Sequence, residues 1–248
     1  MDHAIGELYH FIRSNLVWSF QWAVAIIFFL SLNWIAFRYR SSLRLGAFFP
    51  KRADYLRELK FAVLTLILSF SVVYVIARLL GQAGWLKIYD NREEHGLFYY
   101  YLSFPLVLIA QDLYFYLTHV LLHRGWFYRN VHYAHHQSTT TNPLTGLCFH
   151  PIEGFIHFIF PTLFVLMIPT HTSVFLFLNF WIIISVTYFH SGFIYFPRWL
   201  MRGIWRKLFS NPLHHHLHHA NSRGNYGLYF NYLDWLFGTQ DPAYKERS

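Results

Sequence analysis

Residues 97–123 read LFYYYLSFPLVLIAQDLYFYLTHVLLH, an apolar run that holds one acid, Asp112, and closes on two histidines, His119 and His123. At about 1.5 Å per residue, residues 97–122 are long enough to cross a hydrocarbon core of roughly 30 Å. Histidines four positions apart lie on one face of a helix, so their rings can share a metal ion. The stretch therefore predicts a transmembrane helix that ends in a pair of candidate metal ligands.

Other parts of the chain are similarly apolar. Three further runs of this kind occupy residues 18–37, 61–80 and 152–189. The last is interrupted by Pro169 and is typical of a helical hairpin, with residues 155–168 as the outgoing arm and residues 173–189 as the returning arm. Because the outgoing arm is short, a re-entrant segment is the alternative to a full span. Charged residues make up 13% of the chain, about half of the roughly 25% found in soluble domains. We expect an all-α integral membrane protein with about four transmembrane helices and a histidine-rich cap, forming one membrane domain over residues 1–248.

The basic residues predict the orientation. Seven Lys and Arg residues fall in residues 38–60, two in 123–151 and seven in 191–248, which is sixteen of the 20 in the chain. If the N-terminus faces outward, all sixteen lie on the cytoplasmic side, as the positive-inside rule requires. The cap would then be cytoplasmic. A chain of this size without fused domains favours a bacterial inner membrane, with the endoplasmic reticulum as the alternative.

Histidines carry the candidate chemistry. The chain has 17 of them. Two further motifs, His132-x2-His135-His136 and His215-x2-His218-His219, share one spacing. A lone histidine, His190, ends the last apolar arm. The expected topology places all of these motifs on one membrane face. Eight or nine imidazoles are too many for one metal ion and suit two, and imidazole suits iron, zinc, copper and nickel. The candidate ligands are His119, His123, His132, His135, His136, His190, His215, His218 and His219. The roles of His150, His214 and His216 stay unassigned.

Two acids and a tyrosine are candidates to support these ligands. Asp112 and Tyr116 precede His119 by seven and three positions and share its helical stripe. A carboxylate inside an apolar run is costly and usually paired, so Asp112 is expected to hold the free ring nitrogen of a ligand. An ion pair with Arg78 or another basic group is the alternative. Glu153 is a similar candidate. The single cysteine, Cys148, excludes a cysteine-based zinc or iron–sulfur site.

The order of these motifs resembles the fatty acid hydroxylase / sterol desaturase superfamily. The segments Asn225-Tyr226-Gly227 and Asp234-Trp235-Leu236-Phe237-Gly238-Thr239 are similar to its closing signature, and His150-Pro151-Ile152-Glu153 to its pattern between histidine motifs. The resemblance covers residues 101–239, the expected catalytic core, and adds Asn225 and Asp234 to the supporting residues. It implies two iron ions that use dioxygen to hydroxylate or desaturate an unactivated C–H bond of a lipid, such as a fatty acyl chain, sphingoid base or sterol. Zinc can replace iron during expression, but it has no redox chemistry.

The resemblance also implies partners. Each turnover needs two external electrons, and the chain has no G-x-G-x-x-G segment for a nicotinamide or flavin. A separate carrier, a ferredoxin or small haem protein with its reductase, is expected, and no nucleic-acid partner. The basic face could dock an acidic carrier, although the positive-inside rule explains the charge by itself.

Two other classes of function stay open at this point. A zinc-dependent membrane hydrolase would need a general base beside an open metal position, and no H-E-x-x-H motif is present. A metal or haem transporter would place its site near the bilayer midplane, whereas these histidines are expected at one interface. Metal content and dioxygen consumption separate the three classes.

Overall fold

The described part of the computed structural model contains four helical stretches that are long and apolar enough to cross a membrane. They are Tyr9–Tyr39, Arg52–Gln82, Leu97–Leu122 and Thr172–Phe189. A shorter apolar stretch, Pro151–Met167, precedes the fourth. This confirms an all-α membrane protein with about four spans. The structure describes residues 2–39, 44–45, 50–195, 197–201 and 203–246, so Arg40, Arg202 and Arg247, which entered the charge count, lie outside it.

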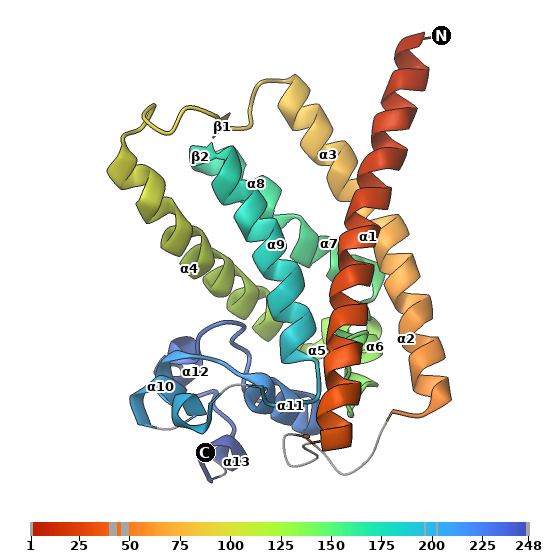
Figure 1. Ribbon diagram of the computed structural model, residues 1–248, viewed down its shortest axis with the longest axis vertical. Coiled ribbons are helices and arrows are strands. Elements are labelled where there is room, and N and C mark those ends of the chain that lie inside the picture. The colour runs from red at the N-terminus through yellow and green to blue at the C-terminus, as the bar shows by residue number, and fades with distance from the viewer. Residues whose placement is uncertain (1, 40–43, 46–49, 196, 202, 247–248) are drawn as a thin grey trace.

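The first two spans pack against each other along the bundle (Figure 1). Helix α1 (Asp2–Tyr39) runs the length of the bundle, and α2 (Arg52–Leu64), η2 (Thr65–Ser69) and α3 (Phe70–Gln82) return beside it. The start of α7 (Pro151–Phe158) packs closely against the five-residue π-helix η2: a Cβ on Gly154 would lie 2.6 Å from the Thr65 side chain. Thr65 and Ser69 donate hydrogen bonds to the carbonyls of Phe149 and Pro151, each at 2.7 Å. The wide turn therefore fixes where α7 begins.

The remaining membrane helices form the other side of the bundle. Helix α4 (Leu97–Leu122) descends toward the cap, α7 and α8 (Phe160–Met167) rise, and α9 (Thr172–Phe189) descends again (Figure 1). The outgoing arm of the hairpin is two short helices and begins at Pro151, four residues earlier than expected, because a proline fits the first turn of a helix. At the end away from the cap, β1 (Ile88–Tyr89) pairs in parallel with β2 (Thr170–His171).

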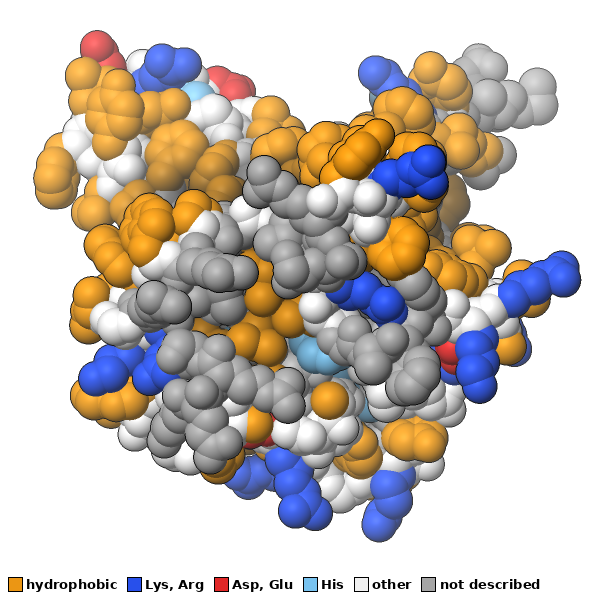
Figure 2. Space-filling model, turned by 60° about the horizontal axis from the view of Figure 1, so that its bottom comes forward, with side chains coloured by type: hydrophobic (Ala, Val, Ile, Leu, Met, Phe, Trp, Pro, Cys, Tyr) orange, Lys and Arg blue, Asp and Glu red, His pale blue; other side chains and the backbone are white. Residues whose placement is uncertain are grey.

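Short helices build the cap at the opposite end. The elements between α4 and α7 are α5 (Gly125–Phe127), η3 (Tyr128–His132), α6 (Tyr133–His136) and η4 (Thr145–Leu147). Those after α9 are η5 (Arg198–Met201), α10 (Gly203–Leu208), α11 (Pro212–Asn221), α12 (Tyr232–Leu236) and α13 (Pro242–Glu246). Figure 2 shows Lys and Arg side chains over this face and a histidine side chain visible among its atoms. Segments far apart in sequence thus meet at one end of the bundle.

The largest hydrophobic core lies directly above the cap. It joins Trp22 and Phe29 of α1 to Phe115 of α4 and Phe158 of α7. It also extends to Leu228 in the segment after α9 (residues 191–248), called the tail below. Burying such side chains stabilises the fold by roughly 1.5–3 kcal/mol each. The core therefore ties the N-terminal spans to the elements that carry the histidine motifs.

Candidate metal centre

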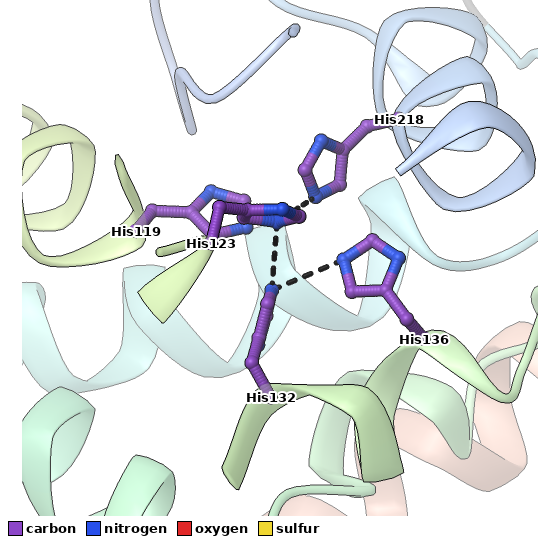
Figure 3. Close-up of side chains that lie close together, drawn as sticks. All are labelled: His119, His123, His132, His136 and His218. Carbon is purple, nitrogen blue, oxygen red and sulfur yellow. Dashed lines mark hydrogen bonds between the residues drawn. The ribbon is translucent and has the colours of Figure 1, made fainter. Parts of the chain in front are cut away.

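Within the described part of the chain, nine histidines form two groups in which the candidate ligand atoms all lie within 4.8 Å of one another. The first group is His119, His123, His132, His136 and His218 (Figure 3). The second group is His135, His190, His215 and His219. His123 is half-buried and the others are buried. The structure brings together all nine histidines that the motifs singled out.

Helical geometry divides each H-x2-HH motif between the two groups. His132 and His136, four apart, contribute to the first group, while His135 turns to the second. In α11, His218 contributes to the first group, and the other two histidines of the motif contribute to the second. Positions i and i+4 share a helix face and position i+3 is rotated away from i+4 by about one hundred degrees. Each motif therefore contributes histidines to both groups.

The outer ring nitrogens of five histidines face oxygen atoms that only accept hydrogen bonds. The Nδ1 contacts are His119 to the Tyr226 carbonyl (2.9 Å), His132 to Glu153 Oε1 (2.7 Å), His135 to the Cys148 carbonyl (3.1 Å), His190 to the Val186 carbonyl (2.7 Å) and His218 to the Gly224 carbonyl (2.7 Å). A neutral imidazole carries one N–H, so Nδ1 holds the proton and donates it, and Nε2 presents a lone pair.

The inner nitrogens crowd together. In the first group, Nε2 of His132 lies 3.0 Å from Nε2 of both His123 and His136 (Figure 3). In the second, Nε2 of His190 lies 3.3 Å from that of His135 and 2.8 Å from that of His215. His135 and His190 both donate through Nδ1, so no proton is left to join their inner nitrogens. Two lone pairs at this distance repel, and a bound cation removes the repulsion. The donor set therefore fits one transition-metal ion in each group.

Burial keeps these imidazoles neutral. It lowers the pKa of His132, His135, His136, His215, His218 and His219 well below the ordinary value, and the neighbouring imidazoles lower it further. Burial also lowers the pKa of His123 to about 2 and that of His190 to about 4. Near pH 7 each imidazole is therefore neutral and leaves one ring nitrogen unprotonated, which is the state that coordinates metal.

Of the candidate supporting residues, Glu153 contacts a ligand ring and Asp112 does not. Glu153 contacts His132 directly, as expected, and its Oε1 lies 3.7 Å from Nε2 of His157. Asp112 is different: its Oδ1 accepts the backbone N–H groups of Tyr229 (2.7 Å) and Phe230 (3.2 Å). Oδ2 of Asp112 makes no hydrogen bond within the described part of the chain, so the expectation that Asp112 holds the ring nitrogen of a ligand was wrong. Seven residues of helix place it about 10 Å from His119 along the axis, where the tail packs.

Tyr116, Asn225 and Asp234 act on the ligands through the tail. The Tyr116 hydroxyl lies 3.0 Å from the Thr239 hydroxyl, which donates to Asp234. Asp234 also accepts the backbone N–H groups of Tyr226 and Gly227, each at 2.8 Å. Burial favours a higher pKa for Asp234, but its hydrogen bonds outweigh burial and hold the pKa below the ordinary value.

The loop that these residues shape supplies two of the carbonyl acceptors. Asn225 donates to the His214 carbonyl (3.0 Å) and accepts the Asp241 N–H (2.8 Å). Gly224 has a φ of +68°, and a Cβ there would lie 2.3 Å from the Thr239 carbonyl oxygen, so only glycine fits. The carbonyls of Gly224 and Tyr226 thereby reach the ligand rings.

The unassigned histidines lie outside the two groups. His150 caps α7, where its Nδ1 accepts the N–H of Ile152 at 3.3 Å. His214 stands between Asp234, 3.3 Å from its Nε2, and the Ser210 hydroxyl, 3.2 Å from its Nδ1. Neither His214 nor His216 belongs to a ligand group.

Sequence reasoning missed one buried acid. Glu58 of α2 is fully buried, and its carboxylate accepts hydrogen bonds from Ser138 (2.6 Å), Asn142 (2.6 Å) and Thr145 (3.0 Å). It fastens the loop that follows His136. Glu58 lies in a basic, polar segment of the sequence, so the sequence pattern does not indicate that its side chain is buried. The carbonyl partners of the ligands were missed as well, because every residue has a carbonyl.

Two adjacent groups of mostly buried imidazoles, each of which could hold a metal ion, lie at one end of an apolar helical bundle. The comparison with family models is specific: the fatty acid hydroxylase model matches residues 104–239, more than half of the chain. The chain belongs to the fatty acid hydroxylase family, which confirms the resemblance seen in the motifs.

Curated relatives in this family carry names of sterol-oxidising enzymes. The chain is 31% identical over 156 residues to a Delta(7)-sterol 5(6)-desaturase of Gibberella zeae, which covers 63% of this chain and 47% of that protein. It is 32% identical over 189 residues to human lathosterol oxidase, 74% of this chain and 60% of that protein. It is 24% identical over 253 residues to a putative Delta(7)-sterol-C5(6)-desaturase of Arabidopsis thaliana, 96% of this chain and 78% of that protein. The chain thus spans about half the length of the Gibberella protein, and no solved structure matches it.

Proposed function

We propose that the chain is a membrane oxygenase that uses two iron ions, dioxygen and external electrons to hydroxylate or desaturate an unactivated C–H bond of a lipid. The observation that carries this proposal is the convergence of inner-nitrogen lone pairs in two adjacent groups. His119, His123, His132, His136 and His218 would hold one iron ion, and His135, His190, His215 and His219 the other. Iron supplies the redox chemistry of dioxygen that zinc lacks.

The protein's own part is to place a lipid and exclude water. A cavity of about 30 Å³ adjoins both groups, and its walls include His119, His135 and the apolar side chains of Phe115 and Phe158. An apolar wall beside the ligands admits a hydrocarbon and keeps bulk water away. The names of the relatives support a sterol among the lipid classes considered.

The two alternatives find less support. A hydrolase needs a general base beside an open metal position, and the sequence has no H-E-x-x-H motif to supply one. A transporter site belongs near the midplane of the membrane, and both groups lie at the end of the bundle where the cap is (Figure 1).

An electron carrier has a suitable surface beside the first group. A polar groove of about 730 Å³ on the cap includes Arg223, Tyr226 and Gln240. The Tyr226 ring centroid lies 5.0 Å from that of His123 and 5.6 Å from that of His218. We propose that a ferredoxin or small haem protein docks over this groove, which offers the carrier a short path to the ligands.

The cap is proposed to face the cytoplasm, in a bacterial inner membrane or in the endoplasmic reticulum. Sixteen of the 20 Lys and Arg residues fall in the sequence segments 38–60, 123–151 and 191–248, which are expected on the cytoplasmic side. In Escherichia coli, a C-terminal green fluorescent protein fusion should fluoresce and a C-terminal alkaline phosphatase fusion should stay inactive. The opposite pair of results would invert the orientation.

The deciding experiment is metal analysis of the detergent-purified protein, followed by reconstitution with ferrous iron. Wild type should hold about two metal ions per chain, and the His135→Ala/His218→Ala double variant, which alters one ligand in each group, should lose them. Iron-loaded wild type, supplied with a reduced electron carrier, should consume dioxygen in a lipid-dependent reaction, and mass spectrometry should find that lipid oxidised. One metal ion or none in wild type would contradict the paired site. If the protein holds two metal ions but oxidises no member of a panel of acyl lipids, sphingoid bases and sterols, the oxygenase would be contradicted.

A further inference from the structure

One imidazole of the first group differs from its neighbours in what its outer nitrogen meets. The outer nitrogens of His119, His132 and His218 face carbonyl or carboxylate oxygens, which only accept hydrogen bonds. Nδ1 of His136 instead lies 3.1 Å from the hydroxyl oxygen of Ser222, a residue 86 positions further along the chain. His136 is buried, and its other ring nitrogen lies 3.0 Å from Nε2 of His132 (Figure 3). The hydroxyl is therefore placed to orient a ligand ring.

The backbone of Ser222 is unusual for a residue that carries a side chain. Ser222 ends α11 in the left-handed region, with a φ of +51° and a ψ of +24°, and its N–H donates to the His218 carbonyl at 2.7 Å. Glycine is the usual residue at this place after a helix, because it has no Cβ. Within the described part of the chain, the other non-glycine residue with a positive φ is Asn225, and asparagine adopts this region more readily than serine. A strained backbone of this kind points to a role for the side chain that it displays.

Ser222 faces inward from a loop whose neighbouring residues face the surface. Asn221 and Arg223 are exposed and line the groove on the cap, whereas the Ser222 hydroxyl reaches a buried ligand. The Ser222 carbonyl contributes as well, because it accepts a hydrogen bond from the ring of His123. One residue thus contacts two ligands of the first group.

The contact with the hydroxyl selects one tautomer of His136. A neutral imidazole has a single N–H, and a metal ligand must present an unprotonated nitrogen. When Nδ1 donates to the hydroxyl oxygen, Nε2 keeps its lone pair and faces the other inner nitrogens of the group. Without the hydroxyl, the tautomer that carries its proton on Nε2 competes with metal binding, and the ring loses a contact that fixes its orientation.

We propose that Ser222 is a positioning residue of the first metal group, held in a left-handed conformation so that its hydroxyl keeps His136 in the orientation and tautomer that bind metal. This inference rests on the proposed function and adds to the site a residue that lies outside its sequence motifs. The strain at Ser222 lowers the stability of the fold, while its hydroxyl raises the affinity for metal. Substitutions at this position should therefore affect fold stability and metal affinity differently.

Two substitutions separate the hydroxyl from the backbone strain. Ser222→Ala removes the hydroxyl and keeps the Cβ, whereas Ser222→Gly removes both. Ser31→Ala is the matched control, because the exposed Ser31 hydroxyl donates to a carbonyl of its own helix, that of Ile27 at 2.8 Å. Each protein is purified in detergent, freed of metal and titrated with zinc against a chelator of known affinity, which gives an affinity for each ion. The melting temperature of the metal-free protein reports the stability of the fold.

Both Ser222 variants should bind one of the two zinc ions about tenfold more weakly than wild type, the lower end of the loss expected when a ligand loses such a partner. The affinity for the other ion should not change. Ser222→Gly should nevertheless melt roughly 2–4 °C above Ser222→Ala, because glycine relieves the strain. The control should alter neither affinity.

A purely structural role for Ser222 gives a different result. Helix α11 supplies His218 to the first group and His215 and His219 to the second, so loosening its end would weaken the binding of both ions. Metal affinity would also follow stability, and Ser222→Gly would bind zinc more tightly than Ser222→Ala. Either result, or unchanged affinity for both ions in Ser222→Ala, would overturn the proposal.

The outcome separates this inference from the proposed function. Weaker binding of one ion in both Ser222 variants, in a protein that oxidises no lipid when loaded with iron, would keep the positioning role and refute the oxygenase. Lipid oxidation by wild type, with zinc affinities that do not depend on Ser222, would do the reverse.

Discussion

Oε1 of Glu153 lies 2.7 Å from Nδ1 of His132, and both side chains are buried. This contact joins α7 to the second histidine motif, and it orients the His132 ring so that Nε2 faces the first group. A carboxylate in this place also makes the imidazole a stronger ligand. The contact exists because η2 and Gly154 allow α7 to begin close to α2 and α3.

Replacing Glu153 should weaken metal binding in the first group. Glu153→Gln keeps an oxygen that accepts from Nδ1 and should cost about tenfold in metal affinity, whereas Glu153→Ala should approach a hundredfold. Competition with a chelator of known affinity measures the change. Glu94→Gln, in an exposed turn, serves as the control. Unchanged affinity in Glu153→Ala would show that the contact does not support the ligand.

Each histidine group should hold its own metal ion. His218→Ala, in the first group, and His190→Ala, in the second, should each leave about one metal ion per chain, because the two groups share no residue. Elemental analysis of the purified variants gives the number. Loss of both ions from either single variant would mean that the two groups bind metal only as one unit.

The metal-free protein should lose stability as the pH falls below about 6.5. Burial holds the folded-state pKa of the ligand histidines below the unfolded value, to about 2 for His123 and about 4 for His190. Between the folded and unfolded values the unfolded chain binds more protons, so stability is full above pH 6.5 and is lost on acidification. The melting temperature of chelator-treated protein in detergent should fall steadily from pH 7 to pH 5. A constant melting temperature over this range would contradict neutral, buried imidazoles.

Asp112 should affect stability more than metal content. Asp112→Asn keeps an oxygen for the N–H groups of Tyr229 and Phe230, so it should retain two metal ions and most of its stability. Asp112→Ala leaves both N–H groups unpaired and should destabilise the protein by about 2–4 kcal/mol. Melting temperature and protease sensitivity of the tail measure the effect. A metal-depleted but stable Asp112→Asn variant would restore the direct role that we expected from the sequence.

Docking of an electron carrier should depend on ionic strength. Turnover with a reduced acidic carrier should slow as salt rises from about 50 to 300 mM, because screening weakens steering between opposite charges. Turnover with a chemical reductant should not change. Arg223→Glu, in the exposed part of the groove, should slow only the reaction with the carrier. Equal effects of salt on both reductants would exclude electrostatic docking.

The sequence by itself determined the membrane class, the length of α4 and the nine histidines of the site. These properties follow from local regularities: an apolar run of membrane length and the repeat of the helix, which places His119 beside His123. Residues 97–122 were expected to form one helix, and the structure has that helix with the same bounds. The sequence also indicated Glu153, as an acid beside an apolar run and in the segment His150-Pro151-Ile152-Glu153 that resembles the family's pattern.

The tertiary structure decided how those histidines are shared and what holds them. The division of each H-x2-HH motif between two groups, the carbonyls of Cys148 and Gly224, and the burial of Glu58 depend on segments far apart in the chain. The helical repeat placed Asp112 on the right face but could not show that the tail would pack there and take its hydrogen bonds. Trp22 lines the cavity beside the histidine groups because α1 packs against α9. Periodicity acts over a few residues, whereas hydrogen-bond partners and cavities are set by packing between elements.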